Sequence, residues 1–172
     1  MMKTLANGSL YSARLSRIAL ALMEQAPSSG GDNMAEIREG GCLCGTVRYR
    51  VKGNPVRASA CHCTFCKRRT GSALGMLVLF DEANVEITGG PLTTYEHRSD
   101  ESQRWIRMQF CPRCGTTVTL KLERFPGACG ISAGTLDDPS WVKIERVIWT
   151  RSALPWMTYP PGIEQFEKAA SR

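Results

Sequence analysis

Apolar and polar positions follow two different patterns along the chain. Between residues 9 and 26 the apolar residues recur at intervals of three and four, as on one face of a helix. Ser9 can cap this helix and Pro27 ends it. Residues 28–33 read SSGGDN, a composition typical of a flexible linker. We therefore predict an N-terminal extension over residues 1–33, made of an amphipathic helix and a linker.

From Met34 onward the apolar positions alternate with polar ones or form short runs, and turn residues separate the segments. Both features are typical of β-strands. The predicted strands cover residues 46–51, 76–80, 85–88, 93–97, 104–110, 118–122, 128–133 and 143–150. A short helix over residues 163–169 is predicted to end the chain. Residues 34–172 are thus expected to form one mainly β domain with few short helices.

Cysteines interrupt this pattern at three places. Residues 61–66 read CHCTFC, and three thiols so close together are too many for one disulfide. Cys42 and Cys44 have C-x-C spacing, and Cys111 and Cys114 have C-x-x-C spacing at the predicted tip of a hairpin. Clustered thiols with these spacings indicate metal sites of the kind that zinc occupies. Cys129 stands alone.

Glycines suggest how seven of the cysteines divide. Cys44 and Cys114 each precede a glycine, as in a tight turn that aims backbone N–H groups at sulfur. We therefore assign Cys42, Cys44, Cys111 and Cys114 to one closed, structural zinc site. Cys61, Cys63 and Cys66 remain for a second zinc with one open position, and an open position permits chemistry.

Composition limits the classes of protein to which the chain can belong. Apolar residues make up 42% and charged residues 22%, which is ordinary for a globular chain, and no apolar run is long enough to cross a bilayer. Cysteines with metal spacing favour a reducing compartment, so we expect the cytoplasm. Seven thiolates and two Zn²⁺ would leave +3 of the formal charge of +6, which is too little to indicate nucleic-acid binding.

The first 33 residues carry basic residues and serines with no acid before Glu24, as mitochondrial presequences do. The alternatives are a dispensable extension, or a true start at Met34. No candidate chemistry lies in this segment.

The motifs together resemble those of a known family. They are GCLCG at 41–45, CHCTFC at 61–66, FCPRCG at 110–115 and GTLDDP at 134–139. In order and spacing they are similar to the glutathione-dependent formaldehyde-activating family, which includes centromere protein V. The resemblance runs from about residue 36 to about residue 167.

This resemblance implies a fold of several coiled antiparallel sheets, the β-tent, stapled by a four-cysteine zinc site. It implies the same two sets of zinc ligands, with Cys61, Cys63 and Cys66 holding the catalytic zinc. The implied activity is that of a carbon–sulfur lyase resembling S-(hydroxymethyl)glutathione synthase. Such an enzyme adds formaldehyde to the thiol of glutathione or of a similar molecule.

Several alternatives stay open at this point. Cys129, His62 or His97 could complete the second site as a fourth ligand, although strand alternation points His62 away from a metal bound by its neighbours. A redox role for the C-x-x-C pairs would need a βαβ setting that the pattern lacks. A different class of function is a non-catalytic, zinc-stapled binding module resembling centromere protein V, although the chain lacks a long basic tail.

Other residues have a functional and a structural interpretation. The basic run Lys67, Arg68 and Arg69 could bind the carboxylates of a glutathione-like thiol, or form a solvated turn. Asp137 and Asp138 precede Pro139 and have the pattern of a turn fixed by side chain to backbone hydrogen bonds. The tryptophans could line a pocket or pack in the core; they include Trp141, Trp149 and Trp156.

Overall fold

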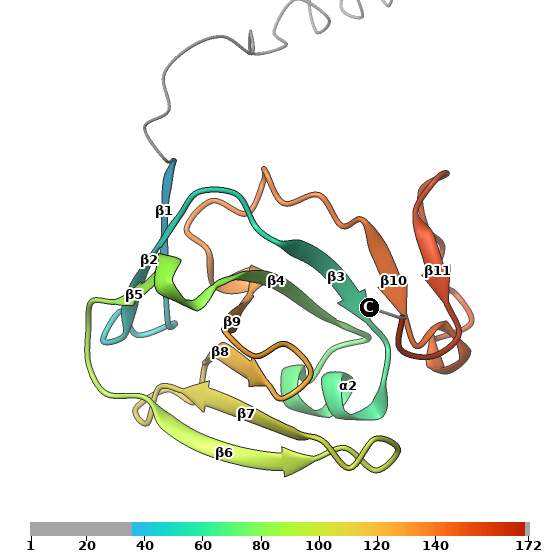
Figure 1. The fold of residues 1–172 in the computed structure, drawn as a ribbon, viewed down its shortest axis with the longest axis horizontal. Helices are drawn as coiled ribbons and strands as arrows, with labels where there is room; N and C mark the ends of the chain where they lie inside the picture. The colour runs from blue at the N-terminus through green and yellow to red at the C-terminus, as the bar shows by residue number, and fades with distance from the viewer. Residues whose placement is uncertain (1–35, 171–172) are drawn as a thin grey trace, which may run out of the picture. The chain divides into compact units, whose positions relative to one another are not determined.

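The computed structural model describes residues 36–170, which fold as a mainly β domain (Figure 1). The prediction of a mainly β fold with several sheets is confirmed. The predicted N-terminal helix and linker lie outside the described residues. Within residues 36–170, α2 is the single α-helix, and it is too short to cross a bilayer.

The strands are β1 (Ile37–Gly41), β2 (Arg48–Lys52), β3 (Arg57–Cys61), β4 (Gly75–Asp81), β5 (Val85–Ile87), β6 (Thr93–Arg98), β7 (Trp105–Phe110), β8 (Thr117–Leu122), β9 (Ala128–Ser132), β10 (Arg146–Ile148) and β11 (Glu164–Phe166). The helical elements are α2 (Thr64–Thr70), η1 (Glu82–Asn84), η2 (Ala133–Thr135) and η3 (Thr150–Ser152).

The strands form two sheets. A three-stranded sheet has the order β1-β2-β5, and an eight-stranded sheet has the order β11-β10-β3-β4-β9-β8-β7-β6. Most neighbours are antiparallel, but β10 pairs in parallel with both β3 and β11. In Figure 1 the small sheet lies at the left, and α2 lies at the right, close to the lower end of β3.

Strand β4, inside the large sheet, carries apolar side chains on both faces, and this explains the continuous apolar run at 76–80. On β4, Val78 and Phe80 point into the hydrophobic core, where they meet Tyr49 and Val51 of the small sheet. Leu77 and Leu79 alternate with them and line a cavity on the opposite face. The core therefore lies between the sheets, and the cavity lies on the other side of the large sheet.

Most predicted strands are present with ends shifted by one to three residues, but the predicted helix at 163–169 is wrong. Residues 164–166 form the edge strand β11, which pairs with β10. Glu164 forms an ion pair with Arg146 of β10, and the Arg146 guanidinium lies over Phe166. These contacts between distant segments outweigh the local helical spacing. The sequence analysis also missed β1, β3 and α2.

Gly40 allows the small sheet to close against the turn at η2. Tyr49, its partner on β2, is 1% exposed and forms a 3.0 Å hydrogen bond with the Thr135 hydroxyl. A Cβ on Gly40 would overlap the Tyr49 ring and the Thr135 carbonyl oxygen. Neither group can move freely, because the ring is buried and the carbonyl belongs to the backbone.

Replacement of Gly40 by alanine is therefore expected to destabilise the domain. We predict that Gly40→Ala lowers the free energy of unfolding by about 1–3 kcal/mol, the usual cost of overpacking a core. Gly134→Ala is the matched control, because nothing lies within 4 Å of its Cβ position. Chemical denaturation of both variants measures the difference, and equal stability of the two would contradict this packing.

Candidate functional site

Two turns with the same backbone conformation bring four cysteines together. Cys42 and Cys44 lie between β1 and β2, and Cys111 and Cys114 lie between β7 and β8. In each turn a glycine with φ above +70°, Gly45 or Gly115, donates its N–H to the carbonyl of the first cysteine. This is the left-handed conformation that glycine adopts at no cost, as the sequence analysis expected.

The sulfur separations fit a shared metal ion. The ligand atoms of the four cysteines all lie within 4.8 Å of one another. The Sγ atoms of Cys42 and Cys44 are 3.5 Å apart, and those of Cys44 and Cys111 are 3.8 Å apart. Tetrahedral zinc with Zn–S bonds of about 2.3 Å separates its sulfurs by roughly 3.8 Å. The four cysteines therefore have the donor set and the spacing that zinc requires.

A threonine supports each turn. The hydroxyl of Thr46 lies 3.3 Å from Cys44 Sγ, and that of Thr116 lies 3.2 Å from Cys114 Sγ. The hydrogen bond with Thr116 lowers the pKa of the Cys114 thiol to about 5, and Thr46 lowers the pKa of Cys44. Sequence reasoning missed both residues, although the repeated tripeptide Cys-Gly-Thr was a signal that could have revealed them.

The other three cysteines meet where β3 passes into α2. Cys61 ends β3, Cys63 is the N-cap of α2, and Cys66 lies in the first turn of the helix. Their ligand atoms also lie within 4.8 Å of one another. The Cys66 backbone N–H donates to Cys63 Sγ over 3.4 Å, which fixes the position of this sulfur. The strand and the helix cap together hold three sulfurs as one group.

The three thiols differ in acidity. Hydrogen bonds from the Cys61 and Cys66 thiols and from backbone N–H groups lower the pKa of Cys63 to about 3. The pKa of Cys61 is raised, because its hydrogen bond with Cys63 holds its proton and because it is buried. The surroundings of Cys63 thus favour its thiolate form, the form that binds metals.

The three candidate fourth ligands have other environments. His62 is completely buried, its Nδ1 lies 3.2 Å from the Ala73 carbonyl oxygen, and its Nε2 lies 2.8 Å from the Tyr159 hydroxyl. His97 stacks on Phe65 with 4.6 Å between the ring centroids. Cys129 packs in the core, where burial raises its pKa to about 11. Among residues 36–170, none of them joins the three-cysteine group.

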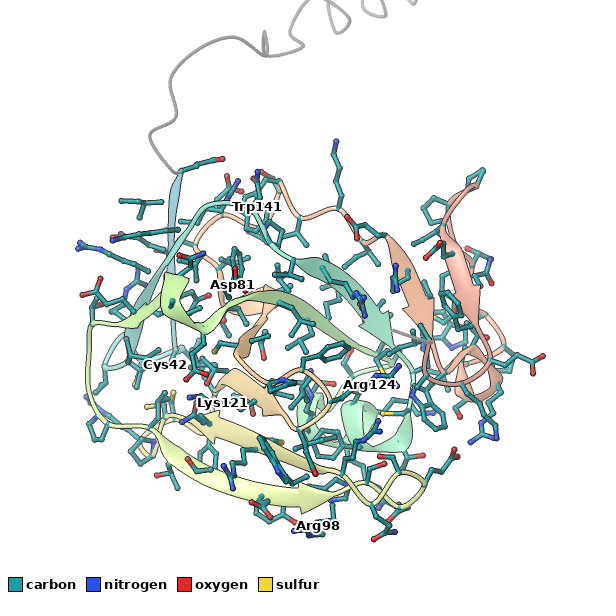
Figure 2. The ribbon with its side chains drawn as sticks, in the orientation of Figure 1. Cys42, Asp81, Arg98, Lys121, Arg124 and Trp141 are labelled. Atoms are coloured by element: carbon teal, nitrogen blue, oxygen red, sulfur yellow. The ribbon has the colours of Figure 1, made fainter. Side chains whose placement is uncertain are left out.

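A cavity of about 580 Å³ opens beside the three-cysteine group. Its apolar wall includes Leu77, Leu79, Leu120 and Leu122 from the large sheet. All three sulfur-bearing residues line it, together with Phe65 and His97. The four-cysteine group lies elsewhere, and in the view of Figure 2 its labelled Cys42 is on the opposite side from Arg124, which lines the cavity. Cys114 of the four-cysteine group lines a separate, smaller cavity, so the two groups of cysteines face different cavities.

The three basic residues that follow the three cysteines lie on α2 and have different surroundings. Arg69 lines the cavity and lies 3.5 Å from the Ser132 hydroxyl. Lys67 instead donates to the Ser152 carbonyl oxygen over 2.8 Å, and Arg68 is exposed. Neither Lys67 nor Arg68 is among the cavity-lining residues. Arg69 is the member of the run that stands beside the cavity.

Asp137, Asp138 and Trp141 make contacts that support the fold, and of the three tryptophans considered Trp149 lines the cavity. Asp138 accepts a hydrogen bond from the Ser140 N–H over 2.9 Å, and Asp137 pairs with Arg48. Trp141 packs against the core, with its ring edge toward Phe80. Trp156 is 67% exposed, whereas Trp149 lines the cavity.

Comparisons with known proteins agree with the motifs. A family model described as glutathione-dependent formaldehyde-activating enzyme matches residues 37–152. A protein of Halomonas elongata, named as a candidate glutathione-dependent formaldehyde-activating enzyme, is 26% identical over 126 residues, which cover 62% of this chain and 80% of the relative. A crystal structure of a Rhodobacter sphaeroides protein aligns with a TM-score of 0.47 and 22% identity, over 61% of this chain and 90% of that one.

The hydrogen bond between Tyr159 and His62 is expected to stabilise the segment that carries the three cysteines. Tyr159→Phe would leave His62 Nε2 buried without this partner, at a cost of about 1–3 kcal/mol in the free energy of unfolding. Tyr95→Phe is the control, because Tyr95 is 54% exposed. Equal thermal unfolding midpoints for the two variants would show that this hydrogen bond contributes nothing.

Proposed function

Because the chain belongs to the glutathione-dependent formaldehyde-activating family, we propose that it is a carbon–sulfur lyase acting on a small aldehyde and a thiol. The aldehyde is formaldehyde and the thiol is glutathione or a similar molecule. The observation that carries the proposal is the three-cysteine group, which has no fourth ligand among residues 36–170 and faces a cavity of about 580 Å³. The name of the Halomonas relative agrees with this chemistry.

The two groups of cysteines have different roles in this proposal. Cys42, Cys44, Cys111 and Cys114 hold a structural zinc that ties the β1–β2 turn to the β7–β8 turn. Cys61, Cys63 and Cys66 hold a second zinc beside the cavity. When bound there, zinc supplies a redox-inert Lewis acid that can polarise a carbonyl oxygen.

The reaction needs no further reactant. A carbon–sulfur bond forms between the thiol sulfur and the aldehyde carbon, the carbonyl π bond breaks, and the thiol proton passes to the aldehyde oxygen. The product is the S-hydroxymethyl thiol, and the reverse reaction releases the same two molecules. The protein has to bring the two partners together and favour the thiolate form of the attacking sulfur.

The residues around the cavity are suited to these two tasks. Leucines of the large sheet exclude water from one wall, and the stacked rings of Phe65 and His97 form another part of the lining. Arg69 lines the same cavity as Cys66, and its positive charge favours the ionised form of an incoming thiol. The Cys63 cap ties its own sulfur to the start of α2, next to Cys66.

Metal analysis tests the assignment of ligands. We expect about two zinc ions per chain, one of which a chelator removes without unfolding the domain. Cys63→Ser should lose that ion and keep the other. Cys129→Ala is the control and should keep both, because Cys129 lies in the core away from either group. A Cys63→Ser protein with two zinc ions and unchanged thermal stability would exclude this assignment.

NMR exchange spectroscopy tests the reaction. In a mixture of glutathione and formaldehyde, the zinc-loaded protein is expected to accelerate exchange between the free thiol and its S-hydroxymethyl adduct. Cys63→Ser should lose this acceleration. Exchange at the spontaneous rate with wild-type protein would exclude this pair of substrates. It would also favour a non-catalytic binding module.

A further inference from the structure

One ion pair joins two segments that belong to opposite ends of the large sheet. The hairpin tip, residues 99–104, connects the edge strand β6 to β7. The η3 segment, residues 149–152, follows β10, which lies next to the opposite edge. Both segments lie at the right in Figure 1, and Glu101 of the hairpin tip pairs with Arg151 of the η3 segment. The large sheet therefore curves so far that side chains from its two ends touch.

This ion pair stands at the opening of the cavity. Glu101 and Arg151 both line the cavity, and both are exposed to solvent. Among residues 36–170, no other hydrogen bond or ion pair joins the hairpin tip to the η3 segment. An exposed ion pair contributes little stability, because water screens both charges. A single weak contact thus holds the two segments together at this side of the cavity.

The η3 segment is anchored to the rest of the domain. The Trp149 N–H donates to the Lys168 carbonyl oxygen over 3.2 Å, and Lys67 donates to the Ser152 carbonyl oxygen over 2.8 Å. The Arg151 guanidinium carbon lies 4.8 Å from the centroid of the Trp149 ring, which also lines the cavity. Arg151 is therefore the fixed partner of the ion pair.

The hairpin tip is held together by its own hydrogen bonds. The Ser99 N–H donates to the Arg104 carbonyl oxygen over 3.0 Å, and the Gln103 N–H donates to the Ser99 carbonyl oxygen over 2.8 Å. The next residue, Trp105, is fixed from both sides. Its N–H donates to the Glu123 carboxylate over 2.7 Å, and its carbonyl oxygen accepts from the Glu123 N–H over 3.2 Å. The hairpin tip can therefore move as one unit beyond Trp105.

The backbone is strained on both sides of the ion pair. Gln103 and Trp149 have φ values of 57° and 61°, and within residues 36–170 they are the non-glycine residues with positive φ. Residues with a Cβ rarely adopt this conformation, and such positions cluster at clamps and switch regions. In the sequence Gln103 lies two residues after Glu101, and Trp149 lies two residues before Arg151. A movement of the hairpin tip that relieves the strain at Gln103 costs less than one of a relaxed loop.

We propose that the hairpin tip is a gate over the cavity and that the ion pair between Glu101 and Arg151 is its latch. This inference goes beyond the proposed function, because it concerns entry to the cavity and not the reaction within it. While the ion pair is formed, the hairpin tip lies against the η3 segment and narrows the opening. Loss of the ion pair increases the fraction of molecules with a wide opening. Because salt screens exposed charges, this fraction also rises with ionic strength.

The reactivity of Cys63, which lines the cavity, reports on the gate. The full chain is treated with a bulky, uncharged maleimide, and mass spectrometry measures the rate of modification at each cysteine. Cys44 is the internal reference, because it is exposed and does not line the cavity. Glu101→Gln is expected to raise the rate at Cys63 relative to Cys44 about two- to fivefold, as the strength of an exposed ion pair implies. High salt should raise the rate in wild-type protein by a similar factor and leave Glu101→Gln unchanged.

Variants of both partners separate the latch from a simple change of charge. Removal of an acid and removal of a base have opposite electrostatic effects on a thiol, so a faster rate in both Glu101→Gln and Arg151→Gln indicates the gate. The double variant should add nothing to either single change. The exchanged pair, Glu101→Arg with Arg151→Glu, should restore the slow rate.

Asp100→Asn is the matched control. Asp100 belongs to the hairpin tip and lines the cavity, but its carboxylate forms no ion pair among residues 36–170. This variant should modify Cys63 at the wild-type rate. Circular dichroism verifies that each variant is folded.

The possible results separate this inference from the proposed function. An unchanged rate at Cys63 in folded Glu101→Gln and Arg151→Gln would overturn the latch, as would an equal increase in Asp100→Asn. Neither result would affect any acceleration of adduct exchange observed with wild-type protein. A faster rate in both variants, with the slow rate restored by the exchanged pair, would support the gate even if wild-type protein did not accelerate adduct exchange.

Discussion

The alternation of side chains across the large sheet is the constraint on which the rest of the structure depends. Successive residues of β3 and β4 point to opposite faces, so each strand contributes both to the core and to the cavity. The core face packs against the small sheet and fixes the position of β3. The end of β3 presents Cys61 on the cavity face, and α2 follows at once with Cys63 as its cap. Packing of the core thereby determines where the three sulfurs lie.

Different backbone structures bring the sulfur atoms together in the two groups of cysteines. The four-cysteine group joins two similar turns whose glycines adopt positive φ, and a threonine supports one cysteine in each turn. The three-cysteine group uses a strand end and a helix cap, which leaves one side of the sulfurs facing a cavity. A closed set of four thiolates suits a structural metal, whereas an open set of three suits a reactive one. The proposed lyase activity follows from this difference.

Several features could be predicted from the sequence because they depend on local spacing. Alternation located most strands, and the Cys-Gly pairs indicated the two turns that meet. The direction of His62 also followed from alternation within the C-x-C segment. The terminal helix was predicted wrongly, because β11 forms through pairing with β10 and an ion pair between Arg146 and Glu164. No local spacing contains the information for such a contact.

The sequence by itself determined the family, the mainly β class and the separation of the cysteines into sets, because motif spacing and side-chain alternation are properties of short segments. Only the tertiary structure decided which basic residues line the cavity. The sequence pointed to the run at 67–69, but of these three residues Arg69 alone lines the cavity, and Lys67 donates to the Ser152 carbonyl oxygen. Arg57, Arg124 and Arg146 reach the cavity from three separate strands or turns. Their convergence depends on sheet order and register, which are set by pairing between segments distant in the chain.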